Sequence, residues 1–170
     1  FPGANTDGGL TKPNVNEYAA FVQDTWRATE RLTFNLGVRY DYFSYAQPKL
    51  QNPDAQLLAA GLRTDRIPTS NTNIAPRFGF AFKPTKDDSM VIRGGYGIYY
   101  ERTPAIVLGT AFSQNAIQVL SYTLFPTNAA FPTYPNVLAT APAASPLNIF
   151  VMAPDYKTPR THQFSLNIEK

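Results

Sequence analysis

The stretch from Leu32 to Tyr42 alternates between apolar and polar side chains without a break. One face takes the apolar and aromatic positions Leu32, Phe34, Leu36, Val38, Tyr40 and Tyr42. The other face takes Thr33, Asn35, Gly37, Arg39 and Asp41. A period of two predicts a β-strand with one apolar and one polar face. Its length of about ten residues is what a tilted strand needs to cross a bilayer, whereas the mean strand has only about five or six.

Similar patterns mark four further segments as strands. The expected strands cover residues 16–27, 32–43, 74–82, 90–100 and 160–169. The phase of the first strand stays open, because Asp24 shares a face with Tyr18 and Trp26 while Phe21 lies opposite. A bulge near Gln23, or a position at the membrane interface, would each explain this conflict. Pro76 is expected near the loop end of its strand or at a bulge, since proline cannot donate to a central ladder.

The connections between these strands alternate between short and long. Residues 28–31 and 83–89 form short turns, whereas residues 44–73 and 102–158 form long connections. Bacterial outer-membrane barrels have short periplasmic turns and long extracellular loops. The sequence therefore predicts an all-β fold, an antiparallel up-and-down meander that is part of a transmembrane β-barrel with long extracellular loops.

The first long loop also carries the signals of a short helix. Asn52 is placed as the N-cap, Pro53 as the first helical residue and Gly61 as the terminal glycine. The second long loop is rich in proline and is expected to be irregular. Loops of that length are usually functional or disordered.

Composition agrees with a membrane barrel. Charged residues make up 16% of the 170 residues, below the roughly one quarter that is usual in soluble domains. No apolar run is long enough for a transmembrane helix, so any crossing must use strands. The net charge of +3 is too mild to indicate a nucleic-acid partner. The chain begins at Phe1 without an initiator Met or a signal peptide, so we expect a fragment or a processed piece.

The sequence offers little for catalysis or for metal binding. Cysteine is absent, and His162 is the single histidine, which excludes thiolate and His-rich metal sites. We expect His162 to be an interfacial or loop residue rather than a catalytic base, because a base needs a nucleophile and an orienting group beside it. The segment Gly94–Gly97 lacks the lysine of a phosphate-binding loop and lies inside a strand, where glycine permits the close approach of another backbone. We therefore expect no enzymatic activity, no metal and no cofactor.

Two groups of residues are candidates for function. The polar strand faces carry the charged residues Arg39, Asp41, Arg77 and Arg93. In a barrel these residues would face the lumen, and the alternative is an ordinary solvated face, where ion pairs contribute little. The long second loop carries the aromatic residues Phe112, Tyr122, Phe125, Phe131, Tyr134 and Tyr156. They are candidates for ligand contact, and the alternative, favoured by the habit of long loops to pack on themselves, is that they form the loop's own clusters.

Four segments together resemble the barrel domain of TonB-dependent outer-membrane receptors, most closely the Oar-like group. They are Tyr18–Arg27, Leu32–Tyr42, Asn73–Phe82 and Arg93–Tyr100. Their order and spacing, with a Gly-Val-Arg-Tyr-Asp strand, an Ala-Pro-Arg strand and an Arg-Gly-Gly-Tyr-Gly strand, are more specific than any one motif. The resemblance covers the strands and not the proline-rich loop.

This resemblance implies a barrel of about 22 strands in the bacterial outer membrane, plugged by an N-terminal domain, that captures a scarce nutrient and imports it. The implied partners are outer-membrane lipid, the remainder of the barrel, the plug domain, the TonB complex acting through the parent receptor, and an unknown imported ligand. With about five expected strands, this chain would supply barrel wall and surface loops rather than a closed barrel.

The competing interpretation is a soluble β-sandwich that binds carbohydrate or protein through its loops. Both folds need one apolar strand face. In a barrel that face meets lipid, whereas in a sandwich it meets a second sheet. A plug-like domain upstream and further alternating strands downstream would decide for the barrel.

Overall fold

The structure is a computed structural model that describes residues 1–85, 89–142 and 148–170. It divides into two compact units. The unit that we call the strand unit consists of residues 16–44, 69–103 and 157–170. The second, which we call the loop unit, consists of residues 1–15, 45–68 and 104–156.

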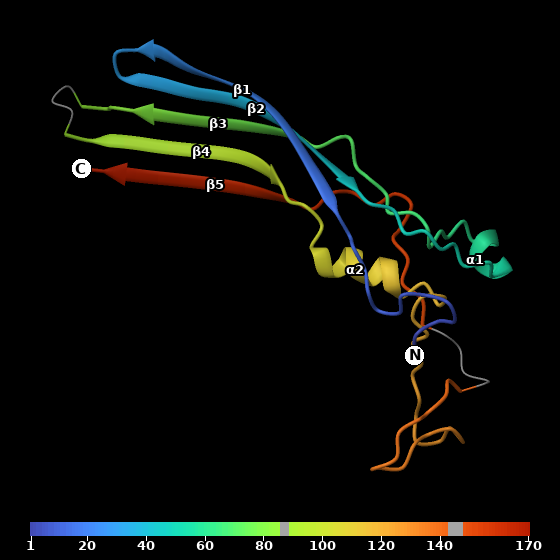
Figure 1. Cartoon of the computed structure of the whole chain (residues 1–170). Helices are drawn as coiled ribbons and strands as arrows, with labels where there is room; N and C mark the ends of the chain where they lie inside the picture. Colours follow the sequence, from blue (N-terminus) through green and yellow to red (C-terminus); the bar gives the residue numbers. More distant parts are fainter. Residues whose placement is uncertain (86–88, 143–147) are drawn as a thin grey trace. The chain divides into compact units, whose positions relative to one another are not determined.

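The strand unit is built on one five-stranded sheet. The strands are β1 (Val15–Thr29), β2 (Leu32–Tyr45), β3 (Ile74–Phe82), β4 (Val91–Tyr100) and β5 (Arg160–Glu169). They lie side by side in sequence order, and the ladders from β2 to β5 are antiparallel (Figure 1). The expected up-and-down meander is confirmed.

The strand ends differ little from those expected. β3 and β5 have the expected bounds, and the others shift by one or two residues at their ends. Because β1 continues to Thr29, only Glu30 and Arg31 form the turn to β2. In that turn the Arg31 N–H donates to the Thr29 hydroxyl at 3.2 Å. The other short turn was expected over residues 83–89, and its residues 86–88 lie outside the described part of the chain.

Aromatic contacts with β2 settle the phase of β1. The ring centroids of Tyr18 and Tyr42 are 6.2 Å apart, and those of Trp26 and Phe34 are 5.8 Å apart. The same number of residues separates Tyr18 from Trp26 as separates Phe34 from Tyr42, so no extra residue is inserted on either strand between these two contacts. The bulge that the sequence left open is therefore absent from this part of β1.

Phe21 and Asp24 are the two residues that break the alternation of β1. Each lies on the face that a strand without a bulge assigns to it. On the polar face, the Thr25 hydroxyl donates to Asn35 Oδ1 at 2.9 Å. Phe21 shares this face with Thr25, since the two lie an even number of residues apart. Asp24 falls on the apolar face, where its carboxylate accepts the N–H of Thr25 at 2.8 Å.

The apolar face continues across the whole sheet. Phe78 on β3 lies opposite Leu36 on β2 and Tyr96 on β4, and Tyr96 lies opposite Phe164 on β5. The centroids of the Phe34 and Phe78 rings are 5.8 Å apart. Nevertheless Leu36 is 43% exposed and Phe164 is 79% exposed. A large exposed apolar surface of this kind marks a face that meets a membrane or a partner.

Gly94 is required where the ring of Phe80 lies over β4. The two residues are opposite each other in the ladder. A Cβ atom on residue 94 would lie 2.4 Å from Cε1 of Phe80. The ring therefore covers a bare stretch of strand, an arrangement that compensates for the weakness of glycine in sheets.

Pro76 lies where the sequence places it. It is opposite Val38 on β2, and the ladder between β3 and β4 begins only at Arg77. The proline is thus at the loop end of β3, beyond the ladder to β4, where a missing N–H costs least.

The helix of the first long loop is shorter than expected and has a different cap. It is α1 (Ala55–Ala59), and its N-cap is Asp54, whose carboxylate accepts two backbone N–H groups of the first turn. The expected cap, Asn52, is instead buried and donates through its side-chain amide to the carbonyl of Asn115 at 2.9 Å. Gly61 follows the helix with a φ of +70°, which agrees with its expected role.

The expectation that the second long loop is irregular throughout was wrong, because residues Ala105–Ser113 form the helix α2. Its N-cap is Pro104, which makes no side-chain capping bond, and its first turn holds no acidic residue. The helix buries Leu108 and Ala111, so packing rather than end signals stabilises it. No helix in the described residues is long and apolar enough to cross a membrane.

Asn115 ties together the two long loops inside the loop unit. Its side chain is completely buried. Its Oδ1 accepts the N–H groups of Ile117 and Gln118 at 2.9 and 2.7 Å. Its carbonyl accepts the amide of Asn52 from the first loop.

We expect Asn115→Leu in the full-length protein to loosen the loop unit. The N–H groups of Ile117 and Gln118 are partly buried, and a fully buried N–H left without an acceptor costs about 1–3 kcal/mol, which is the upper bound for each of them. Limited proteolysis of the folded protein should therefore cut residues 45–68 and 104–142 faster than in the wild type. Asn136→Leu, at an exposed position, is the matched control. Equal cleavage of the two variants would contradict this role for Asn115.

Candidate functional site

The ladder register gathers polar residues of neighbouring strands into adjacent rows on one face of the sheet. One row contains Asn35, Gly79, Gly95 and Ser165, and the next contains Gly37, Arg77, Gly97 and Gln163. Gln23 of β1 extends the second row, since a Cβ atom on residue 37 would lie 3.6 Å from the Cβ of Gln23. Glycine occupies four of these nine positions, so much of the strand backbone has no side chain above it.

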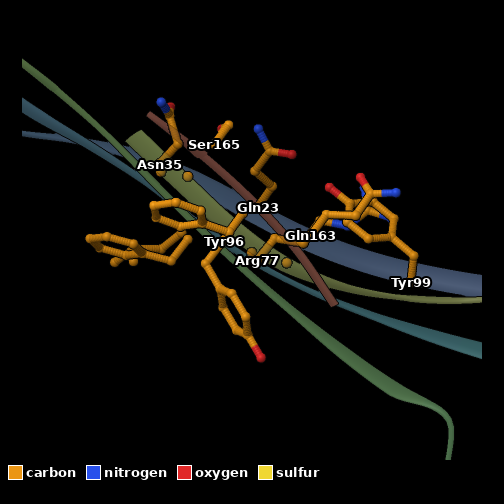
Figure 2. A pocket seen from close by; sticks show the side chains of 14 residues that line it. Gln23, Asn35, Arg77, Tyr96, Tyr99, Gln163 and Ser165 are labelled. Carbon is orange, nitrogen blue, oxygen red and sulfur yellow. The ribbon is translucent and has the colours of Figure 1, made fainter. Parts of the chain in front are cut away.

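An open recess of about 300 Å³ lies over these rows. We call it the glycine recess. Its polar lining residues are Gln23, Asn35, Arg77, Gln163 and Ser165. Figure 2 shows Gln23, Asn35 and Ser165 on one side of the sheet and the ring of Tyr96 on the other. The recess therefore opens on the polar face.

Arg77 is held in the recess by an aromatic ring. Its guanidinium carbon Cζ lies 4.6 Å from the centroid of the Tyr99 ring (Figure 2). That ring lies over Gly97, where an added Cβ atom would come within 2.9 Å of Tyr99 Cε2. The absence of a side chain at residue 97 thus leaves room for the Tyr99 ring beside Arg77. A contact of this kind contributes about 0.5–1 kcal/mol at an exposed site.

The charged residues singled out from the sequence share the polar face but do not form one cluster. Arg39 Nε donates to Asp41 Oδ1 at 2.8 Å, and Asp41 is buried. Arg93 Nη2 lies 3.6 Å from a carboxylate oxygen of Glu169. In the described part of the chain, Arg77 has no carboxylate partner.

His162 lies within a strand rather than in a loop. It is opposite Ile98 in the ladder between β4 and β5, on the apolar face. Its Nδ1 is hydrogen-bonded to the Tyr96 hydroxyl at 2.7 Å. The histidine and the glycine recess thus lie on opposite faces of the sheet.

The loop unit contains a cavity of its own, of about 640 Å³, which we call the loop cavity. Three separate segments line it, within residues 4–12, 46–50 and 112–118. Its larger apolar lining residues are Leu10, Leu50, Phe112 and Ile117, and its charged ones are Asp7, Lys12 and Lys49. Its volume falls in the range of small-molecule sites, about 300–1,000 Å³.

The loop aromatics do not converge on this cavity. Phe112 lines it. Tyr122 instead packs edge-on against the ring of Phe1, with centroids 6.1 Å apart. The others do not line it, with Tyr156 half-buried and the remaining three, Phe125, Phe131 and Tyr134, exposed. The structure thus places one of the proposed ligand contacts at a cavity and separates the rest.

Arg63 and Asp65 form an exposed ion pair in the loop unit, and neither residue lines the loop cavity. Arg63 donates from Nε and Nη2 to the carboxylate of Asp65 at 2.8 and 2.6 Å. These hydrogen bonds lower the pKa of the Asp65 carboxyl and raise the pKa of Arg63. Because exposed pairs contribute little stability, we assign this pair no part in either site.

Comparison with known families identifies the fold. The family model of an outer membrane beta barrel domain matches residues 3–170. The chain belongs to this family. No curated protein and no solved structure gives a significant match. This outer-membrane barrel domain accordingly resides in the bacterial outer membrane, and its described strands form an open part of a barrel wall.

Reasoning from the sequence missed most of both sites in this barrel domain. In the glycine recess it found Arg77 but not Gln23, Gln163 or Tyr99. A usable signal was present, because three successive strands carry glycine at polar-face positions. For the loop cavity the candidates named from the sequence included Phe112 and no other lining residue. No comparable signal was present there, since residues 1–9 have only the composition of a loop.

Proposed function

We propose that this outer-membrane barrel domain is a segment of a TonB-dependent receptor of the Oar-like group, which captures a nutrient and imports it. The order and spacing of its strand motifs support this assignment. The strand unit would supply barrel wall, and the loop unit would supply the surface that captures the ligand. The observation that carries the proposal is that both long connections and the N-terminal residues pack into one compact unit with a cavity of about 640 Å³.

In this proposal the apolar face of the sheet meets outer-membrane lipid, and the polar face lines the lumen. Exposed apolar side chains such as Phe78 and Leu166 support the first part. The free edges of β1 and β5 would join the remainder of the barrel. A plug domain would lie in the lumen, and the TonB complex would act through the parent receptor.

The lining of the loop cavity fits a ligand with an apolar body and a negatively charged group. Phe112 and Ile117 offer apolar contact, and Lys12 and Lys49 lie among the polar lining residues. Asp7 partly offsets their charge. We assign the cavity a role in binding, because among the described residues no hydrogen bond joins a lining hydroxyl to the Asp7 carboxylate or to a lysine, and the Thr6 hydroxyl donates to backbone carbonyls instead.

The ligand can be sought by growth. A strain that lacks the gene is grown with one carbon, nitrogen, phosphate or metal source limiting at a time, which reveals the source whose use needs the gene. Depletion of the TonB complex should stop uptake of that source, whereas passive diffusion through a pore should continue. Uptake that survives both the gene deletion and TonB depletion contradicts the proposal.

We expect Phe112→Ala together with Lys49→Ala to weaken uptake of the source so identified by about tenfold or more at limiting concentration. Loss of a buried aromatic contact alone costs about 1.5–3 kcal/mol of binding. The amount of protein in the outer membrane should not change. Phe125→Ala, at an exposed position of the same loop, is the control. If both variants take up the nutrient like the wild type, the loop cavity is not the capture site.

A further inference from the structure

The glycine recess contains the positive charge of Arg77, which has no carboxylate partner among the described residues. Arg39 and Arg93 each have a carboxylate oxygen within 3.6 Å. In the described part of the chain, the guanidinium of Arg77 contacts the ring of Tyr99 and no carboxylate, and no Asp or Glu is among the described residues that line the recess. A guanidinium stacked by one face on a ring keeps its N–H edge free for a planar, bidentate acceptor such as a carboxylate.

The floor and the rim of the recess indicate what carries that acceptor. Gly79 and Gly95 lie opposite each other and present bare backbone. Another backbone can approach closely at such positions. The side-chain amides of Gln23 and Gln163 lie at the two ends of the neighbouring row, which holds Gly37, Arg77 and Gly97. Each amide offers both a donor and an acceptor, as a peptide group requires.

We propose that the glycine recess is a docking site for an extended polypeptide segment that presents an Asp or Glu side chain to Arg77. The segment lies over the glycine floor, its peptide groups bond to the flanking amides, and its carboxylate takes the free edge of the guanidinium. This inference rests on the proposed placement of the polar face in the lumen. It goes beyond that proposal, because it states the chemistry of what touches the wall and where.

The test places an amine at residue 77 and looks for the carboxylate beside it. Arg77→Lys is made in the full-length protein, which is treated in its native membrane with a carbodiimide. This reagent joins an amine to a carboxylate only where the two are in contact. Mass spectrometry of the digested protein should find the lysine introduced by Arg77→Lys joined to an Asp or Glu outside the strand unit. Arg27→Lys, at an exposed position of β1 outside the recess, is the matched control and should give no such product.

A second experiment tests the case in which the acidic segment belongs to another protein. The capped peptide Ala-Ser-Glu-Ser-Ala is added to purified full-length protein, and its Gln counterpart serves as the control peptide. We expect the Glu peptide to bind about tenfold more tightly than the Gln peptide, which is the usual gain from a hydrogen bond to a charged group. Arg77→Gln should remove this difference.

The results decide between the possible occupants. A crosslink within the parent chain supports a resident segment, and selective binding of the Glu peptide supports a separate one. Absence of any crosslink together with equal binding of the two peptides overturns the proposal. Acetate that competes as well as the Glu peptide also overturns it, because the site would then take a free anion. Neither measurement depends on nutrient uptake, so failure here is distinguishable from failure of the proposed function.

Discussion

Leu36→Arg should prevent the full-length barrel from assembling, whereas Asn35→Arg should be tolerated. Leu36 lies on the apolar face opposite Phe78, and Asn35 lies on the polar face opposite Gly79. An arginine on the lipid face near the middle of the membrane costs about 2–4 kcal/mol, whereas lumen positions accept it at little cost. The measurement is the amount of folded protein recovered from the outer-membrane fraction.

The two substitutions control for each other. They are adjacent in the same strand and introduce the same side chain, so effects of strand propensity and net charge are matched. The difference between them therefore reports which face meets lipid. Equal recovery of the two folded variants would show that the faces are assigned wrongly.

The isolated chain of 170 residues is expected to aggregate in plain buffer. β1 and β5 would each leave an unpaired strand edge, and edges of this kind pair with other chains. Trp26, Phe164 and Ile168 are more than half exposed, so the apolar face would associate as well. Size-exclusion chromatography should find the chain in the void volume without detergent and in a defined peak with detergent micelles.

The same experiment tests the competing fold. A soluble sandwich would bury the apolar face against a second sheet and would need no detergent. A monodisperse monomer that unfolds cooperatively in plain buffer would therefore contradict the open barrel segment.

Strand positions could be predicted from the sequence where a single pattern decides them. In β2 every residue from Leu32 to Tyr42 obeys one alternation, and the ladder with β3 keeps the phase that the alternation indicates. The phase of β1 could not be predicted, because Asp24 and Phe21 oppose the pattern. Only the ring contacts of Tyr18 and Trp26 with β2 resolve it, and these depend on the partner strand.

Elements stabilised by distant contacts escaped prediction. α2 follows Pro104 without a side-chain cap, so the sequence shows no start signal. Asn52 has the composition of a helix cap, yet its amide bonds to the carbonyl of Asn115, which lies far along the chain. Local rules describe Asp54 and Asn52 equally well, and only the tertiary contact distinguishes them.

The two candidate sites show the same limit. Alternation assigns Arg77 to the polar face, but the ladder register is needed to place Gly97 and Gln163 beside it. The loop cavity joins three segments of the chain that no local pattern relates. Its lining therefore became visible only when the packing of the loop unit was known.

The discontinuous make-up of the loop unit has a consequence for biogenesis. Its segments 1–15, 45–68 and 104–156 alternate with the strands β1 to β4 along the chain. During synthesis the first segment precedes β1 and the last follows β4, so the unit cannot close before those four strands exist. An antibody that recognises only the closed unit would therefore detect barrel domains that have passed this stage of assembly, and it would not detect chains that stalled before it.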